Sequence, residues 1–311
     1  MAMYGIPYQG SKSAIADDII AHLPAGNRLV DLFGGGFAIS HCALLSRKWK
    51  QVLYNDINPL LIPLIRGAIA GKYSYEQFVP EFISREEFFA KKDTDGYVKW
   101  IWSFGNDGRT YMFSKNVEPM KRAGHEWVFH NTPISGFHNL KCDLPCDAAH
   151  FSERRKFLSY YTKAHKSERY ELQQLQQLQR LERLQRLEQL ERLERLQQLE
   201  RITTLEMTCM DYRDYKYQDG DVVYCDIPYQ NTSDRNPDYG INFDFGAFYG
   251  WAVAQPYPVY FSSYKLGGLV WSGEKISTMA AASNSLKRVE ALYCVDDHYN
   301  PPPKYIQLPM F

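Results

Sequence analysis

The sequence of 311 residues lacks several features that would assign it to a class at once. It has no run of roughly 18 apolar residues, so we expect no membrane span. Its six cysteines are scattered, unlike the dense framework of a small disulfide-bonded protein. Its 36 basic residues are balanced by 36 acidic ones, so a polyanionic partner must be met by a local patch and not by net charge.

The N-terminal stretch MAMYGIPYQGSK also lacks the basic-then-apolar order of a signal peptide. With the scattered cysteines, this predicts a cytoplasmic protein. What the sequence has in quantity is apolar side chains, 45% of the total, enough for one large or two medium domains.

Short apolar runs alternate with helical patterns near both ends of the chain. RLVDLF (28–33) and QVLYND (51–56) predict buried strands, each followed by a helical stretch. Strand patterns return in DVVYCDIPY (221–229), YPVYFSSY (257–264) and RVEALYCV (288–295). This alternation is typical of an α/β domain with parallel strands. Residues 73–165 interrupt it, and their composition predicts a mostly helical insertion.

Residues 171–201 are a simple repeat with Leu at every third position from Leu172 to Leu199 and only Gln, Glu and Arg between. These fillers favour a helix, of roughly 45 Å for this length. Three residues turn an α-helix by about 300°, so the leucines circle the helix and cannot follow a two-stranded coiled-coil seam.

Two conformations of the repeat stay open: an α-helix with Leu on all sides, or a 3₁₀-like segment that aligns the leucines but is unfavourable at this length. Its purpose is equally open. It is either an expansion tolerated in a helical hairpin or a surface for self-association or partner binding over residues 172–199.

Two strand ends carry features that suit a nucleoside. DLFGGGF (31–37) places glycines between a strand and a helix, where the backbone can approach a ligand closely, although a tight turn would look the same. The next strand ends in Asn55-Asp56, and an acid there can accept hydrogen bonds from ribose hydroxyls. Nothing here suits pyrophosphate, so the pair predicts a nucleoside-bearing cofactor without phosphates.

The stretch DIPY (226–229) follows another apolar run. Pro228 biases Ile227 toward extended backbone, which can turn the Ile227 carbonyl outward beside the Asp226 carboxylate. Two acceptors then lie at a strand's carboxyl end, where open α/β sheets bind ligands, and Tyr229 adds a flat face. An exocyclic amino group on a planar ring fits this set; a strand-ending turn with a surface tyrosine is the alternative.

DLFGGGF, NDIN and VVYCDIPY, in this order, resemble the Dam-like DNA adenine-N6 methyltransferases. PYQGSKSAI, TCMDYRDY and PVYFSSY are similar to further segments of that family, and WSFGNDGRTYMFS loosely resembles part of its recognition domain. Together the segments of the catalytic domain cover roughly residues 4–60 and 205–264. Ile227 stands where the family's D-P-P-Y motif has proline; the carbonyl is kept, so we expect a modest effect on rate.

The resemblance implies a Rossmann-like, mostly parallel methyltransferase sheet built from residues 1–65 and 203–311. It implies a mainly helical target-recognition domain at 66–166, which the repeat helix at 167–202 follows. The implied reaction moves a methyl group from S-adenosylmethionine to N6 of an adenine flipped out of duplex DNA.

The resemblance also assigns residues to the reaction. The target adenine would be held by Asp226, Ile227, Pro228 and Tyr229. The cofactor would be bound by Tyr8, Lys12, Asp31, Phe33, Gly34, Gly36, Asp56 and Asp211.

Contacts to DNA are predicted in the inserted region. The candidates are Asn106, Arg109 and Lys115, and the dense basic point Arg154, Arg155 and Lys156. An ordinary solvated helix face is the alternative. No metal is expected: four ligand-type residues stand at four-residue steps, where a helix would line them up on one face, namely His138, Cys142, Cys146 and His150.

Two other functions stay open from the sequence. One is an amino-methyltransferase that acts on RNA or on a protein amide. The other is a non-catalytic module that binds DNA or a partner.

Overall fold

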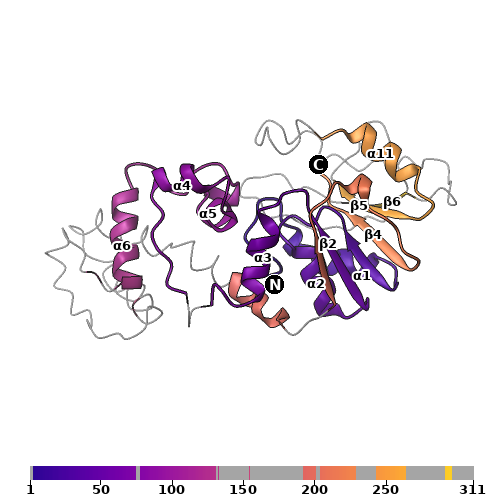
Figure 1. Ribbon diagram of the computed structural model, residues 1–311, viewed down its shortest axis with the longest axis horizontal. Coiled ribbons are helices and arrows are strands. Elements are labelled where there is room, and N and C mark those ends of the chain that lie inside the picture. The colour runs from indigo at the N-terminus through magenta and orange to yellow at the C-terminus, as the bar shows by residue number, and fades with distance from the viewer. Residues whose placement is uncertain are drawn as a thin grey trace, which may run out of the picture. The chain divides into compact units, whose positions relative to one another are not determined.

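The computed structural model describes residues 3–74, 78–130, 132, 154, 192–200, 204–228, 243–263 and 291–295. The chain forms two compact units, one made of residues 1–70 and 195–311 and the other of residues 71–194 (Figure 1). The domain boundaries predicted at residues 65, 166 and 202 stay predictions; helix α3 (Leu61–Ile69) runs through the first of them.

The first unit is built on a six-stranded sheet in the order β3-β2-β1-β4-β5-β6 (Figure 1). The strands are β1 (Arg28–Asp31), β2 (Gln51–Asn55), β3 (Leu205–Thr208), β4 (Asp221–Cys225), β5 (Val259–Ser263) and β6 (Ala291–Val295). β1 to β5 run parallel, and β6 pairs antiparallel with β5. The predicted α/β class with a mostly parallel sheet is confirmed.

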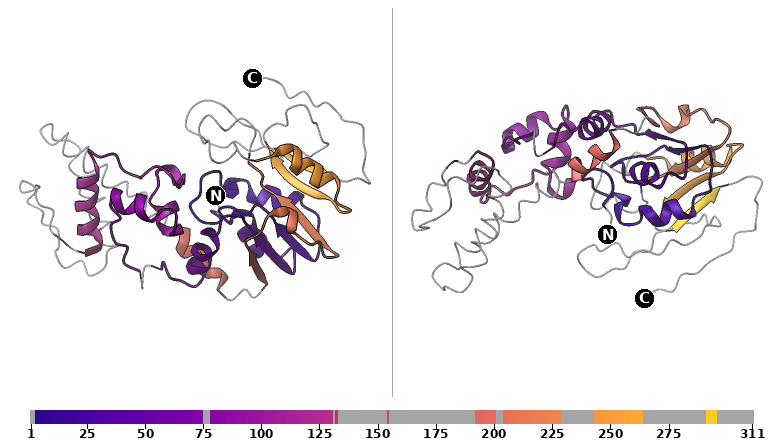
Figure 2. Two further views of the ribbon diagram at one scale, coloured as in Figure 1. Left: turned by 45° about the horizontal axis from the view of Figure 1, so that its top comes forward. Right: turned by 90° about the horizontal axis from the view of Figure 1, so that it is seen from below.

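Helices connect and cover these strands. The helical elements of this unit are η1 (Lys12–Ala14), α1 (Ala16–His22), α2 (Ala38–Ser46), α3, η3 (Leu196–Leu199), η4 (Tyr212–Asp214) and α11 (Phe245–Val253). α2 packs on β1 and β2, and α1 packs on α2. In both views of Figure 2, the orange and yellow strands β5 and β6 continue the sheet that the indigo strands begin.

The central strands are short and buried. All four residues of β1 and the last four of β4 are buried, as expected for parallel strands that are covered on both faces. Strand β3 does not follow the same rule, because its residues are half-buried or exposed at the sheet edge. Its alternation LEMT is only four residues long, and the sequence analysis did not predict this strand. The strand predicted at 28–33 ends at Asp31, which leaves Leu32 and Phe33 to the turn.

The second unit contains α4 (Arg85–Lys91), α5 (Gly96–Ile101), η2 (Phe104–Asn106) and α6 (Glu118–His130) among its described residues. Ser84 and Glu87 form a capping box at the start of α4, and the Asp95 side chain caps α5. Aromatic rings pack between the helices; the Trp102 ring meets Phe82 edge-on at 5.2 Å. That this unit recognises the DNA target stays a prediction.

The described end of the Leu repeat is a helical segment at 192–195 that tightens into the 3₁₀ helix η3. Leu193, Leu196 and Leu199 are at most 1% exposed. A 3₁₀ helix has three residues per turn, so it places residues three apart on one face. Residues 171–191 lie outside the described part, and the long repeat helix stays a prediction.

Candidate active site at the carboxyl ends of the central strands

The strand order changes direction between β1 and β4, with β2 and β3 on one side and β5 and β6 on the other. Open parallel sheets bind ligands outside the carboxyl ends of their strands at such a point. Asp31 ends β1, Asp226 directly follows β4, and Asp56 directly follows β2. The topology therefore brings three of the predicted acids to one end of the sheet.

Asp31 is the most buried of these acids, with 1% of its surface exposed. Ser40 Oγ donates to its Oδ2 at 2.7 Å, and its Oδ1 has no hydrogen-bond partner among the described residues. Burial raises the pKa of Asp31 to about 7; the Ser40 bond opposes the shift, while the charges of Asp226 and Asp56 add to it. A buried oxygen without a donor suits a ligand that brings one.

Asp56 fixes the glycine turn. Its two oxygens accept hydrogen bonds from the Gly35 and Asn58 backbone N–H groups, both at 2.8 Å. Burial raises the pKa of Asp56, and these two bonds oppose the shift. Tyr54 Oη donates to the Gly35 carbonyl at 2.8 Å, so both the N–H and the carbonyl of Gly35 are hydrogen-bonded.

The turn leaves no room for side chains at its other glycines. A Cβ at Gly34 would lie 2.2 Å from the Tyr54 ring, and one at Gly36 would lie 2.5 Å from Cβ of Tyr8. Tyr8 therefore lies against the turn, so the N-terminal segment and the glycine turn, both predicted to bind the cofactor, form one structure.

Lys12 contacts the predicted catalytic acid. Its Nζ lies 2.5 Å from Oδ1 of Asp226, and the two side chains are 5% and 21% exposed. Ser262 Oγ donates to the same Oδ1 at 3.4 Å and shares a 2.8 Å hydrogen bond with Tyr224 Oη. No sequence signal could have found these partners, because Lys12 and Asp226 are separated by 214 positions.

Ile227 points its side chain into the core. It is 2% exposed and belongs to a cluster with Val30, Phe248 and Phe261. Pro228 is half-buried, and Tyr229 lies outside the described residues. The side chain that departs from the family motif therefore serves packing.

Phe33 packs against the same cluster, and so do Met210 and Tyr212, the chain neighbours of Asp211. The Phe33 ring packs against those of Tyr212 and Phe248, with centroids 5.2 and 5.9 Å away. Both Asp211 oxygens accept from the Arg213 guanidinium, at 2.8 and 2.6 Å, and this pairing lowers the pKa of Asp211. The predicted contact of Asp211 with the cofactor's adenine would have to coexist with this pairing.

Asn55 is a site residue that sequence reasoning missed. Its Nδ2 donates to the Leu32 and Met210 carbonyls, both at 3.0 Å. Its Oδ1 accepts from the Met210 N–H at 3.0 Å and from Thr208 Oγ1 at 2.9 Å. It thereby ties the loops after β1 and β3 together, and its one sequence signal is its place directly before Asp56.

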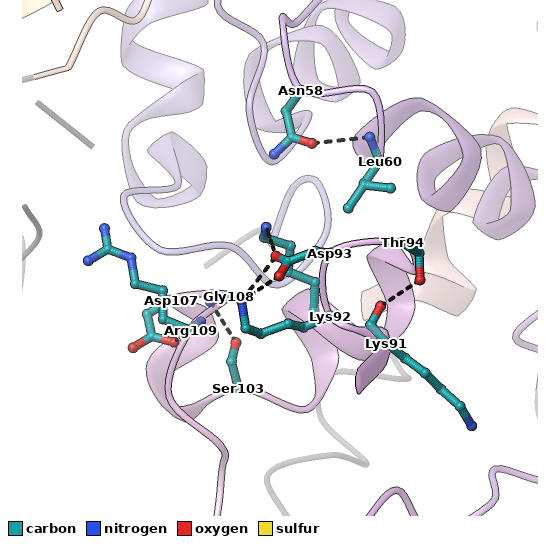
Figure 3. Close-up of polar contacts among 11 residues, drawn as sticks. Asn58, Leu60, Lys91, Lys92, Asp93, Thr94, Ser103, Asp107, Gly108 and Arg109 are labelled. Carbon is teal, nitrogen blue, oxygen red and sulfur yellow. Dashed lines mark hydrogen bonds and ion pairs between the residues drawn. The ribbon is translucent and has the colours of Figure 1, made fainter. Parts of the chain in front are cut away.

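Asn106 and Arg109, two of the predicted DNA-contact residues, lie in a turn that is held by several hydrogen bonds. Figure 3 shows one of them, between Gly108 and Ser103. The hydrogen bonds that hold the turn include Asn106 Nδ2 to the Trp100 carbonyl at 2.8 Å, Gly108 N–H to Ser103 Oγ at 2.9 Å, and Arg109 N–H to Asp107 Oδ1 at 2.8 Å. Lys115 is exposed beyond the turn. Asn106 is thus partly engaged by the backbone, while Lys115 is accessible.

Arg154 is a correction to the predicted set. It is buried, and its Nε and Nη2 donate to the carbonyls of Val128 and Phe129, at 2.6 and 3.1 Å, at the end of α6. It therefore caps a helix, and that position does not suit a phosphate contact. Arg155 and Lys156 lie outside the described residues.

The described ranges contain neither a metal-binding cluster nor a membrane-spanning helix. The four metal-ligand-type residues spaced four apart in the sequence lie outside these ranges: His138, Cys142, Cys146 and His150. Within them, no group of three or more His, Cys, Asp or Glu side chains could hold a metal ion. No helix in the same part of the chain is long and apolar enough to cross a membrane.

The family model of the D12 class N6 adenine-specific DNA methyltransferases matches residues 8–246, well over half of the chain. The match includes the glycine turn, Lys12, Asp56 and Asp226. The chain has no match among curated proteins. The family match confirms the resemblance seen in the sequence, and the chain belongs to the D12 class of N6 adenine-specific DNA methyltransferases.

Proposed function

We propose that the chain methylates N6 of an adenine flipped out of duplex DNA, with S-adenosylmethionine as donor, at the carboxyl ends of β1 and β4. The observation that supports this proposal is that Asp31, Asp56 and Asp226 lie together at the carboxyl ends of the strands, where the strand order changes direction. A base in a duplex is out of reach of such a site, so it must leave the stack at a cost of a few kcal/mol.

The residues present fit the cofactor. Oδ1 of Asp31 is a buried acceptor without a donor, suited to the ammonium group of the methionine part. Asp56 can accept hydrogen bonds from the ribose hydroxyls, and the glycine turn with Tyr8 against it leaves backbone within reach. When bound, S-adenosylmethionine supplies an electrophilic methyl group on a sulfonium.

The acceptors at Asp226 and Ile227 would activate the target. The lone pair of the adenine N6 is delocalised into the ring, so this amine is a poor nucleophile. Hydrogen bonds from both of its N–H groups to the Asp226 carboxylate and the Ile227 carbonyl favour a tetrahedral nitrogen with a localised lone pair. Stacking on Tyr229 would orient the base, so positioning and preorganised electrostatics contribute most.

The ion pair of Lys12 with Asp226 implies an order in which Lys12 and the target adenine contact Asp226. The Lys12 ammonium contacts Oδ1 of Asp226, the oxygen that would accept a hydrogen bond from the adenine amino group. It also supplies the charge that a partly buried carboxylate needs. We infer that an arriving adenine shares or takes this position, so Lys12 holds Asp226 in place until the base enters.

The experiment is to incubate the purified chain with labelled S-adenosylmethionine and duplex DNA, and to map N6-methyladenine by sequencing. We expect methylated adenine at a defined sequence, with single-stranded RNA and a protein mixture as matched acceptors that stay unlabelled. Label on RNA or on a protein amide, without N6-methyladenine in DNA, would overturn the proposal. Cofactor binding without transfer to any acceptor would also overturn it.

A further inference from the structure

His41 is a buried ionisable side chain on α2 for which the reaction scheme has no role. Its Nδ1 lies 3.0 Å from the backbone N of Gly5, and its Nε2 lies 2.9 Å from the side-chain amide of Gln198. Its ring stacks on Phe37, with centroids 6.1 Å apart, and meets the edge of Tyr4 at 5.5 Å. The ring therefore contacts segments that are far apart in the chain.

The hydrogen bonds determine the tautomer of His41. A backbone N–H can only donate, so Nδ1 accepts from Gly5 and the ring proton lies on Nε2. Burial lowers the pKa of His41 to about 4, which keeps the ring neutral at neutral pH. The Nε2–H then needs an acceptor, so the Gln198 amide presents Oε1 to the ring; the two amide orientations differ only in the assignment of O and N.

Gly5 contacts both His41 and the glycine turn. Its φ is +69°, and a Cβ there would lie 2.1 Å from the Gly36 carbonyl oxygen, so only glycine fits. The next residue, Ile6, donates its N–H to that same oxygen at 2.9 Å. The segment then continues to Tyr8, which lies against the turn, and to Lys12, which contacts Asp226.

Gln198 belongs to the last turn of the Leu repeat. Leu196 and Leu199 flank it in η3, both are buried, and η3 packs beside α3 in the same unit. The leucines thus anchor this turn to the catalytic unit, and Gln198 reaches from it to His41.

We propose that His41, oriented by Gln198, is a positioning residue that holds the N-terminal segment so that Tyr8 meets the glycine turn and Lys12 meets Asp226. This inference rests on the proposed function and deepens it. It assigns the end of the Leu repeat a role in the cofactor site, through one side-chain amide.

The test compares Gln198→Ala with Gln197→Ala, its half-buried neighbour on η3. Loss of one hydrogen bond to the buried ring should raise the Kd for S-adenosylmethionine by about fivefold in Gln198→Ala, as for a bond worth ~1 kcal/mol. KM for the cofactor should rise more than kcat falls, and Gln197→Ala should match the wild type. Equal Kd values in the two variants would overturn the proposal.

A spectroscopic readout needs no activity. In ¹⁵N NMR of the full chain, His41 should carry its proton on Nε2, and a proton on Nδ1 would overturn the proposal. His41→Asn keeps an acceptor near Gly5 and should retain cofactor affinity better than His41→Leu; equal losses in both would contradict it. If the tautomer is as inferred but no N6-methyladenine forms in DNA, the proposed function fails separately from this inference.

Discussion

Asp31 and His41 are two buried side chains on either side of the glycine turn, and burial shifts their pKa values in opposite directions. The folded state holds the Asp31 proton up to about pH 7, while it excludes the His41 proton down to about pH 4. Stability therefore falls with rising pH on account of Asp31 and rises with pH on account of His41. The two slopes oppose each other over most of the same range.

Replacing Asp31 should reveal one of these slopes. From pH 4 to pH 7 the free energy of unfolding of Asp31→Asn should increase relative to wild type, by at most roughly 4 kcal/mol, because the variant lacks the raised pKa. The groups that face Asp31, namely Ser40, Asp56 and Asp226, remain in both proteins. Urea unfolding across this range measures the difference, and a constant difference would contradict the prediction.

Ile227 separates packing from chemistry. Because its side chain fills the core, Ile227→Ala should lower the free energy of unfolding by about 2–5 kcal/mol, and Ile227→Val by only about 0.5–1.5 kcal/mol. The backbone carbonyl is unchanged, so kcat well below the melting temperature should stay within about tenfold of wild type. A loss of kcat in Ile227→Val without a loss of stability would count against this division of roles.

At the scale of elements, the end of the Leu repeat resolves part of an ambiguity in the sequence. A three-residue period does not match an α-helix, and the described end solves this with one turn of 3₁₀ helix that buries its leucines. Such turns are short, as the poor hydrogen-bond geometry of longer 3₁₀ runs requires.

The buried leucines of η3 should carry its stability. Leu196→Ala should cost about 2–5 kcal/mol of unfolding free energy, since it empties a buried site beside α3. Gln197→Ala, at a half-buried position on the same turn, should change it by less than about 0.5 kcal/mol. Thermal or urea unfolding separates the two, and similar losses in both variants would show that η3 is not anchored by its leucines.

Two basic residues outside helix α6 make a matched pair: Lys115 precedes the helix, and Arg154 donates to the carbonyls of its last residues. Arg154→Ala leaves two carbonyls at the helix end without their donor and should cost about 2 kcal/mol of stability with little change in the salt dependence of DNA binding. Lys115→Ala, exposed, should do the opposite: unchanged stability, weaker binding, and a slope against log salt that is smaller by about 1. A reduced salt slope in Arg154→Ala would restore that residue to the DNA contacts.

At the scale of the whole molecule, local patterns predicted most of what places the site. The apolar runs of β1, β2 and β4 and the acids at their ends follow from sequence, because a buried parallel strand needs apolar residues and its carboxyl end binds ligands. The ion pair of Lys12 with Asp226 could not be predicted, since it depends on tertiary packing. The predicted DNA contact of Arg154 was wrong because a cluster of basic residues in the sequence does not show which of their side chains is buried.

The fold also assembles the site from both ends of the chain. β1, β2 and the N-terminal segment precede residue 71, whereas β3, β4 and β5 follow residue 194, and the second unit lies between them in sequence. Asp226 and the acids Asp31 and Asp56 therefore lie at one end of the sheet only once β1 pairs with β4.

Methyl transfer by Asp226→Ala tests the central claim most directly. Removing the acid strands the Lys12 ammonium, so Asp226→Ala is paired with Lys12→Met/Asp226→Ala, which removes both charges and controls for stability. Asp226→Ala should still bind S-adenosylmethionine, and at saturating cofactor the single-turnover methylation of adenine N6 in duplex DNA should fall at least about a hundredfold in both variants. Wild-type rates in either variant would contradict the role of Asp226 as the acceptor that activates the amine.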